Sequence, residues 1–349
     1  VYKRQVWKFV SNSKAPEKQE NKIGGFEDME KIKWGVLGCA GIAAEQTIPA
    51  MQQAENAELY GIASRGLEKA EAFQKRFGFA KAYDSYEALL DDPQVQAVYI
   101  PLPNSLHGEW VRKAAAKGKH VLCEKPLSGS AKDVEDIIRC CDEAGVVFME
   151  AFAYLHSPII QEIKKTVQSG AIGKVTMAEA AFFIVPPKPE DIRWKKETLG
   201  GGVYDVGCYP ISLFLNLFEE APEEIKAAAH FTGQGVDDFA GMYFGYADGK
   251  KLSISCGMCT SQRADRFYLY GTEGTLEAPI PYNAKGALHY SIVRGDVVTT
   301  KTMQVEDNYK LEIEQLGRCV LNGEKPWVSH RFSIENAKII DRVLEAIGY

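Results

Sequence analysis

The sequence predicts an α/β protein with a doubly wound parallel sheet in its first half and a strand-rich second half. Three observations support this. Short apolar runs alternate with helical stretches from residue 33 to residue 150. A glycine-containing turn follows the first of these runs. Aromatic, strand-like segments with visible alternation dominate from residue 174 onwards.

The apolar runs of the first half predict parallel strands, and the stretches between them predict helices. Ligands of such sheets bind at the carboxyl ends of the strands, where the strand order reverses. We therefore look for a site directly after these strands. The expected strands are 34–37, 59–63, 97–100, 119–123 and 146–150, and the expected helices are 42–53, 66–77, 105–117 and 130–144.

The length of 349 residues fits two domains. We expect a nucleotide-binding domain at 31–151 and a substrate-binding and dimerisation domain at 152–349, whose last helix, 333–347, packs back. The polar stretch before them lacks periodicity. We expect residues 1–30 to be a disordered or non-native leader, with Met29 as the natural start.

Composition excludes several classes of protein. A net charge of -6 without a basic stripe gives no reason to expect nucleic acid or an anionic membrane as a partner. No apolar run approaches the roughly 20 residues that span a bilayer. Eight cysteines in a chain of this length form no disulfide framework, so we expect a reducing, cytoplasmic compartment. The histidines show no metal-ligand spacing, and we expect no metal.

The turn after the first strand is the expected pyrophosphate site. Gly38 permits the tight turn, and a helix that begins near Gly41 offers free N–H groups to a phosphate. The glycine pattern is incomplete, because Ala40 and Ala43 occupy its second and third positions. A tight strand–helix turn without a ligand is the alternative. We expect dinucleotide binding by Gly38, Ala40, Gly41 and Ile42.

The end of the second strand bears on which dinucleotide binds. NAD sites usually have an acidic residue there, whereas this chain has Ser64 and Arg65, with Lys69 one helical turn further on. A guanidinium binds a phosphate with two parallel hydrogen bonds, so these residues favour the 2′-phosphate of NADP over NAD. The alternative is a solvated arginine at a helix start.

Six motifs follow one another along the chain: Gly38–Ala43, Ala63–Arg65, Pro101–Asn104 with His107, Glu124–Pro126, Met149–Phe152 with Tyr154 and Pro158, and Gly200–Tyr209. Their order and spacing cover essentially everything after Met29, and the set resembles the Gfo/Idh/MocA oxidoreductases. The resemblance implies a Rossmann domain, then an α/β domain on an open, mostly antiparallel mixed sheet. It also implies hydride transfer at a carbinol carbon, usually of a sugar or polyol.

Lys125 is the first catalytic candidate. A lysine between an apolar strand and a proline is costly to bury unless its ammonium has a function. The resemblance implies that Lys125 lies near the nicotinamide ribose and the substrate hydroxyl, and that the bond to Pro126 is often cis. Beside an oxidised nicotinamide and an apolar wall we expect a lowered pKa. A structural pair with Glu124 is the alternative. Cofactor contacts are further expected from Pro101, Leu102, Asn104, His107, Glu124 and Lys125 itself.

Asp205 and Tyr209 form the second cluster. They are four residues apart, so on a helix they share one face, although Pro210 predicts a kink or a late start. Tyr209 stands where many members of the family have histidine. This resembles the branch of dimeric dihydrodiol dehydrogenases, NADP-dependent aldose (xylose-type) dehydrogenases and glucose–fructose oxidoreductase. There the tyrosine is the candidate acid/base, acidified by Lys125, and Asp205 orients it or the substrate.

Further substrate contacts are expected from Tyr154, Arg193 and Trp194, with a surface loop as the alternative for the last two. A packed tyrosine with a satisfied hydroxyl is the alternative for Tyr209. The family commonly dimerises through the open face of its second sheet, so a homodimer or higher homo-oligomer is expected.

The expected function is an NADP-dependent oxidoreductase that transfers a hydride between the nicotinamide and a carbinol of a sugar, polyol or cyclic diol. Two alternatives stay open. One is a glycoside hydrolase of the same fold that recycles a bound NAD, which Ser64 and Arg65 oppose. The other is a cofactor-sensing regulator without catalysis, which the presence of Lys125 and Tyr209 opposes.

Overall fold

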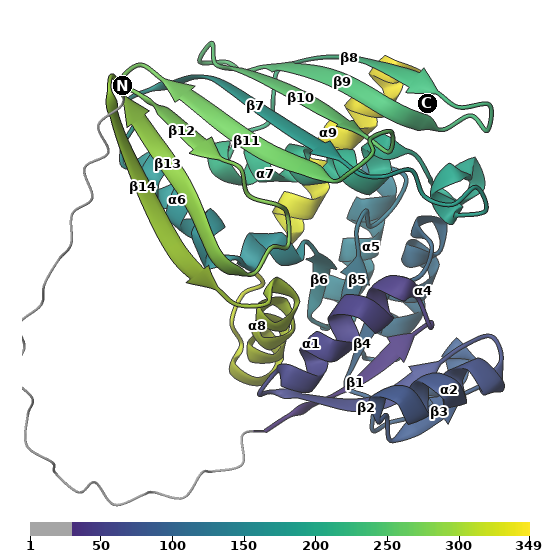
Figure 1. Ribbon diagram of the computed structural model, residues 1–349. Coiled ribbons are helices and arrows are strands. Elements are labelled where there is room, and N and C mark those ends of the chain that lie inside the picture. Colours follow the sequence, from purple (N-terminus) through teal and green to yellow (C-terminus); the bar gives the residue numbers. More distant parts are fainter. Residues whose placement is uncertain (1–29) are drawn as a thin grey trace, which may run out of the picture.

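The computed structural model describes residues 30–349. The expected leader therefore lies outside the described residues, apart from Glu30. Figure 1 shows two sheets in different layers of the molecule, with the helices of the second half between them.

The first sheet has six parallel strands in the order β3-β2-β1-β4-β5-β6, as expected for a doubly wound sheet. Its inner strands are buried along most of their length, and β4 is fully buried. This burial on both faces explains their continuous apolar runs. The strands are β1 (Ile32–Leu37), β2 (Ala57–Ala63), β3 (Lys81–Tyr83), β4 (Ala97–Ile100), β5 (His120–Glu124) and β6 (Phe148–Ala151).

Helices cover both faces of this sheet, which gives two apolar cores. One core lies under α3, α4 and α5, and the other continues from α1 into the second half of the chain. A π-helical turn, Ala43–Thr47, precedes α1. The helices are α1 (Ile48–Gln53), α2 (Leu67–Phe77), α3 (Tyr86–Asp91), α4 (His107–Ala116) and α5 (Ala131–Glu143).

The second sheet has eight strands in the order β14-β13-β12-β11-β7-β10-β9-β8. Only the pair of β7 and β10 is parallel among its described pairs, so the sheet is mixed and mostly antiparallel, as expected. Its strands are β7 (Val175–Phe183), β8 (Glu224–Phe231), β9 (Asp237–Gly245), β10 (Lys251–Gly257), β11 (Ala264–Gly271), β12 (Thr275–Ala278), β13 (Gly286–Arg294) and β14 (Val297–Val305).

Helices of the second half pack on one face of this sheet, and no element of residues 30–349 covers its other face (Figure 1). The closing helix, α9, also reaches back to α5 and β6 of the first sheet. The domain boundary expected after residue 151 stays a prediction. These helices are α6 (Pro158–Gln168), α7 (Cys208–Phe218), α8 (Asn308–Asn322) and α9 (His330–Ile347).

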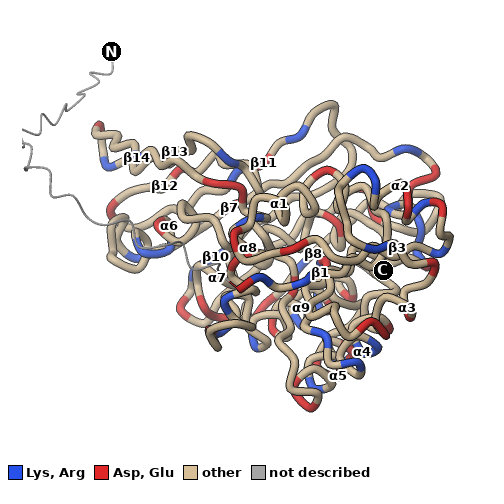
Figure 2. The backbone as a smooth tube through the Cα atoms, turned by 90° about the horizontal axis from the view of Figure 1, so that it is seen from below, with Lys and Arg blue, Asp and Glu red and all other residues tan. Residues whose placement is uncertain are grey.

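Acidic and basic residues are interspersed along most elements in Figure 2. No helix in the described part of the chain is long and apolar enough to span a membrane.

Candidate active site

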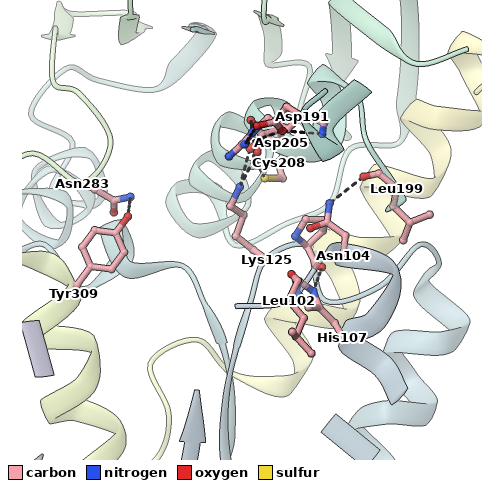
Figure 3. Close-up of polar contacts among 12 residues, drawn as sticks. Leu102, Asn104, His107, Lys125, Asp191, Leu199, Asp205, Cys208, Asn283 and Tyr309 are labelled. Carbon is pink, nitrogen blue, oxygen red and sulfur yellow. Dashed lines mark hydrogen bonds and ion pairs between the residues drawn. The ribbon is translucent and has the colours of Figure 1, made fainter. Parts of the chain in front are cut away.

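Lys125 directly follows β5, and its side chain points toward the start of α7 (Figure 3). Its Nζ donates a hydrogen bond of 2.8 Å to the backbone oxygen of Asp205 and lies 3.8 Å from that residue's carboxylate. The same nitrogen is 4.7 Å from the centre of the Tyr209 ring. The three expected catalytic residues are thus neighbours. The bond between Lys125 and Pro126 is cis, as the resemblance implied.

The pKa of Lys125 differs from the expected one. Burial alone would lower its pKa, but attraction to Cys208, Asp205 and Glu124 outweighs burial, and the pKa is raised above its usual range. The lowered pKa was expected beside an oxidised nicotinamide; the groups that this chain itself provides, Cys208 first and then Asp205 and Glu124, raise the pKa instead. The partner in its ion pair is Asp205, and no ion pair joins Lys125 to Glu124 within residues 30–349.

Tyr209 lies in an aromatic cage. Burial raises its pKa well above the usual range, and Cys208, Glu124 and Asp205 raise it further. Lys125 faces the ring, and its Nζ hydrogen-bonds to the Asp205 carbonyl instead of the phenol. The expectation that Lys125 acidifies Tyr209 is therefore wrong, and the phenol keeps its proton at neutral pH. Four rings form the cage, with centroids 5.1 to 6.3 Å from that of Tyr209: Phe152, Tyr154, Phe182 and Tyr282.

Asp205 is held by a second cation. Arg193 Nε donates a bond of 2.8 Å to its Oδ2, and Asp191 binds the same guanidinium at 3.2 Å. Burial would lower the pKa of Arg193, but attraction to Asp205, the largest effect, raises it. Arg193 is thus part of the cluster through its bonds to two carboxylates, and its contact with a substrate stays a prediction.

The segment that carries Asp205 is a π-helical turn, Val203–Gly207, and α7 begins directly after it. This is the late start that Pro210 predicted. Asp237 of β9, which is fully buried, accepts the N–H of Val203 at 2.8 Å and holds the turn from behind.

The glycines before this turn have a structural reason. A Cβ on Gly201, whose φ is +108°, would lie 2.3 Å from Asp237 Oδ1, and a Cβ on Gly200 would lie 2.4 Å from the Arg193 carbonyl. The close approach in the structure is to the protein's own carboxylate and backbone.

His107 is buried, and both ring nitrogens contact carbonyl oxygens, Nδ1 that of Pro126 at 2.9 Å and Nε2 that of Leu102 at 2.8 Å. Burial lowers its pKa to about 4. No ring nitrogen is left for a cofactor, so His107 joins the loop after β4 to the loop after β5. Asn104 donates to the Leu199 carbonyl at 2.9 Å and connects the same loop to the glycine segment (Figure 3).

Two expected substrate contacts are engaged inside the protein. Tyr154 is buried, and its hydroxyl lies 2.7 Å from Ser212 Oγ and donates to the Tyr209 carbonyl at 3.2 Å. Trp194 is buried and donates its Nε1–H to the Pro187 carbonyl at 3.1 Å. Tyr154 therefore supports Tyr209 from behind, and Trp194 packs in a small core of its own.

The expected pyrophosphate turn has the geometry that a phosphate needs. Gly38 has a φ of +116°, and a Cβ on Gly41 would meet nothing within 4 Å. The first helical hydrogen bond runs from Ala44 N–H to the Ala40 carbonyl at 3.1 Å. The N–H groups of residues 41–43 therefore lack helical partners and are available to an anion. Gly41 and Ile42 are exposed.

The residues at the end of β2 fit a phosphate. Arg65 and Lys69 are exposed, and neither side chain has a hydrogen bond or ion pair within the described residues. Burial raises the pKa of the Cys39 thiol, and the nearby Lys69 and Ser64 offset part of that rise. Tyr86 is a neighbour of Arg65 that sequence reasoning missed. Two free cations beside the nucleotide turn suit the 2′-phosphate of NADP.

Glu124 accepts a bond of 2.6 Å from Tyr99 Oη, which itself accepts from Thr47 at 3.0 Å. Glu124 therefore takes part in a hydrogen-bonded chain that joins the end of β5 to β4 and to the turn before α1. Pro101 and Leu102 are buried after β4.

Sequence reasoning missed the opposite wall of the site. Tyr309 of α8 and Asn283, joined by a hydrogen bond of 3.1 Å, lie across from Lys125 in Figure 3. Arg263 lies 5.0 Å from the centre of the Phe182 ring and lowers the pKa of Tyr209 in part. Tyr309, Asn283 and Arg263 belong to none of the motifs named above. In the sequence they are recognisable only as polar residues close to strand-like segments.

Two family models match the chain. The model described as "Oxidoreductase family, NAD-binding Rossmann fold" matches residues 32–152, and the "GFO/IDH/MocA C-terminal domain" matches residues 160–277.

The chain is 37% identical to D-xylose 1-dehydrogenase (NADP(+)) 2 of Haloferax volcanii, over 90% of this chain and 97% of that protein. It is 30% identical to trans-1,2-dihydrobenzene-1,2-diol dehydrogenase of Xenopus tropicalis, over 90% of this chain and 98% of that protein. Among solved structures it is similar to a 3-ketoreductase from Actinomadura kijaniata in complex with NADP and TDP-benzene. The TM-score is 0.85 and the identity 31%, over 91% of this chain and 98% of that one.

Proposed function

This chain belongs to the Gfo/Idh/MocA oxidoreductase family, and from that premise we propose that it is an NADP-dependent dehydrogenase or reductase. It transfers a hydride between the nicotinamide and a carbinol carbon of a sugar, polyol or cyclic diol. Relatives named for a sugar, a diol and a ketone substrate support this range. NADP, when bound, supplies or accepts the hydride.

The observation that carries the proposal is the meeting of Lys125, Asp205 and Tyr209 at the carboxyl end of β5. Two proton-holding groups and a carboxylate lie there within one small cluster, at the edge of the sheet where the nucleotide turn also lies. A purely structural cluster would not need an ammonium in a largely buried position, where its desolvation is costly.

The chain's own residues would handle the proton. Tyr209 and Lys125 both hold protons at neutral pH, so either can donate to the oxygen of a carbonyl that is being reduced. Arg193 holds Asp205 in place, where its carboxylate can accept a bond from a substrate hydroxyl. We assign Tyr209 as the proton donor and Lys125 as its electrostatic partner.

The 2′-phosphate of NADP would bind to Arg65 and Lys69, and the pyrophosphate to the N–H groups of residues 41–43. The free side chains and the open space beside Gly41 support this assignment.

Purified protein, assayed by NADPH absorbance, tests the function. Aldoses, polyols and trans-diols are scanned with NADP and NAD. We expect turnover that prefers NADP and falls by about 10²- to 10⁴-fold in Lys125→Ala and Tyr209→Phe. Net sugar release from an aryl glycoside without NADPH formation would favour the glycosidase alternative. Cofactor binding without turnover of any kind would favour the regulator.

We also propose a homodimer formed through the open face of the second sheet. Exposed Phe239 stacks on Phe183 there, and Met177 is also exposed, which supports an apolar interface. A cytoplasmic location is part of the same proposal, supported by eight cysteines that are all free thiols.

A further inference from the structure

Glu150 belongs to the motif Met149–Phe152, and the proposed function gives it no role. It lies on β6 opposite Cys123 of β5 and is 3% exposed. Its Oε1 accepts the backbone N–H of Leu127 at 3.0 Å. Leu127 is two residues beyond Lys125, so this carboxylate holds the chain as it leaves the proposed catalytic lysine.

Glu150 also acts on Lys125 through charge. Burial raises the pKa of Glu150 to about 7, while the Ser333 hydroxyl, the Leu127 N–H and Lys125 lower it and Glu124 raises it. The ammonium and this carboxylate are therefore close enough to interact, although no ion pair joins them within residues 30–349. Glu150 bonds to the backbone of the loop at Leu127, and Asp205 pairs with the Lys125 side chain.

The second oxygen of Glu150 lacks a partner. Its Oε2 is buried without a hydrogen bond to any described residue, and so is Oδ1 of Asn336, which is 1% exposed. Both residues line one small cavity that Pro126, Leu127 and Ser128 cover. The Ser333 hydroxyl lies near Glu150 and also has no hydrogen bond within the described residues, so it can donate to Oε2. It offers one donor for two buried acceptors whose residues line one cavity, so a second donor is needed. The cavity has room for about one water molecule, which offers two donors.

Helix α9 provides the other side of this cavity. Asn336 and Ile340 line it from α9, and Asp341 of the same helix accepts the Ala131 N–H at 2.8 Å at the start of α5. The last helix of the chain is thus bonded to the start of α5 and lines the space beside the loop that follows Lys125. A molecule in the cavity would connect that helix to the loop directly.

We propose that Glu150 is a positioning residue for Lys125, and that a water molecule bound between Glu150 Oε2 and Asn336 Oδ1 ties α9 to the catalytic loop. This inference rests on the proposed function, because it takes Lys125 to be catalytic. Glu150 holds Leu127 N–H with one oxygen and the water with the other. The loop then has one position, and the lysine ammonium is aimed at Asp205 and Tyr209.

Kinetics of the full chain separate this role from a structural one. Glu150→Gln keeps the acceptor for Leu127 N–H, whereas Glu150→Leu removes it and Asn336→Leu fills the cavity. We expect kcat to fall about 10- to 100-fold in Glu150→Leu with the KM for NADP nearly unchanged, because misplacing a catalytic group slows chemistry more than binding. Glu150→Gln restores most of kcat, and Asn336→Leu lies between them.

Glu335→Gln is the matched control, since it removes a carboxylate from α9 that pairs with Lys338 outside the cavity. It keeps wild-type kcat. Thermal unfolding of every variant shows whether the fold persists. Wild-type kcat in a folded Glu150→Leu would overturn the positioning role.

A crystal structure at a resolution that shows ordered water tests the site without turnover. One water within hydrogen-bond distance of both oxygens, absent in Asn336→Leu, supports the inference. A dry cavity, or an Asn336 amide nitrogen bonded directly to Glu150, would overturn the water. Absence of any wild-type turnover would instead defeat the proposed function, and the crystallographic result would still decide the water site.

Discussion

At the residue scale, burial and neighbouring charges together control the protons of the site. The pKa values of Lys125, Tyr209 and Glu124 are all raised, so a neutral solution leaves the phenol and the ammonium protonated. The site is then a proton donor, which suits reduction of a carbonyl. Oxidation of the alcohol needs a group that has already lost its proton.

The two directions should therefore differ in their dependence on pH. We expect kcat for alcohol oxidation to rise from about pH 7 to about pH 10, and kcat for carbonyl reduction to stay level or fall. Initial rates with one substrate pair, measured in both directions at saturating cofactor, check this. An oxidation rate independent of pH across that window would contradict a protonated Tyr209 as the resting form.

Arg65 should decide cofactor preference. Arg65→Ala removes a guanidinium that has no partner within residues 30–349, so stability should not change. The KM for NADP should rise about 10- to 100-fold and the KM for NAD should hardly move, because only NADP carries the 2′-phosphate. Arg76→Ala, on the same domain and over the Phe77 ring, is the control. Equal effects on both cofactors would refute the assignment.

Asp237 should make stability depend on pH. Burial raises its pKa to about 6, while the Val203 N–H lowers it. The folded state thus binds its proton more tightly than the unfolded state, and stability falls as pH rises from about 4 to about 6. Asp237→Asn keeps an acceptor for Val203 and should remove this fall, with a gain of roughly 2 kcal/mol above pH 7. Urea unfolding at pH 4 and pH 8 measures it.

At the element scale, the sequence predicted those strands whose burial shows as a run of apolar residues. All four residues of β4 are buried, and its apolar run is continuous. By contrast, β14 is exposed at nearly every position, so no pattern marks it, and β3 has only three residues. Helices α6 and α8 also went unpredicted. The π-helical turns before α1 and α7 carry no sequence signal that we recognised.

Gly201 is the most constrained residue of the segment before α7. Gly201→Ala would combine a positive φ with a contact of 2.3 Å to Asp237 Oδ1, and that carboxylate is fixed by the Val203 N–H. We expect a loss of about 2 to 4 kcal/mol in the free energy of unfolding and a large loss of kcat. Gly233→Ala, where an added Cβ meets nothing within 4 Å, is the control. Chemical unfolding compares the two, and equal stabilities would contradict this account.

At the scale of the whole molecule, the motifs indicated the candidate site residues but not the residues that hold them in place. Lys125 and Asp205 stood in motifs, whereas Asp237 and Tyr309 did not, and their contacts join segments far apart in the sequence. His107 was recognised as a residue of interest, yet only the fold showed that both its nitrogens face carbonyls. A single sequence reports neighbours along the chain and leaves partners across it unknown.

The open face of the second sheet leads to the last prediction. Alternation along its strands puts Phe183, Phe239, Tyr243 and Tyr268 on the face that no described element covers, and Met177 is 40% exposed beside them. Exposed apolar side chains that share one flat surface are typical of an interface, and a second copy can cover that face with twofold symmetry.

Phe239→Lys should convert the dimer to a monomer, because the symmetric contact would bury two added charges near each other. Light scattering coupled to size exclusion measures the mass, with Val297→Lys, at an exposed residue on the edge strand β14, as the control that stays dimeric. Tyr209 of α7 packs on Phe182, which belongs to the helix-covered face of the sheet, and Lys125 lies over the Tyr209 ring, so the monomer should still bind NADP. A monomeric wild type would remove the proposed interface and leave the catalytic assignment standing.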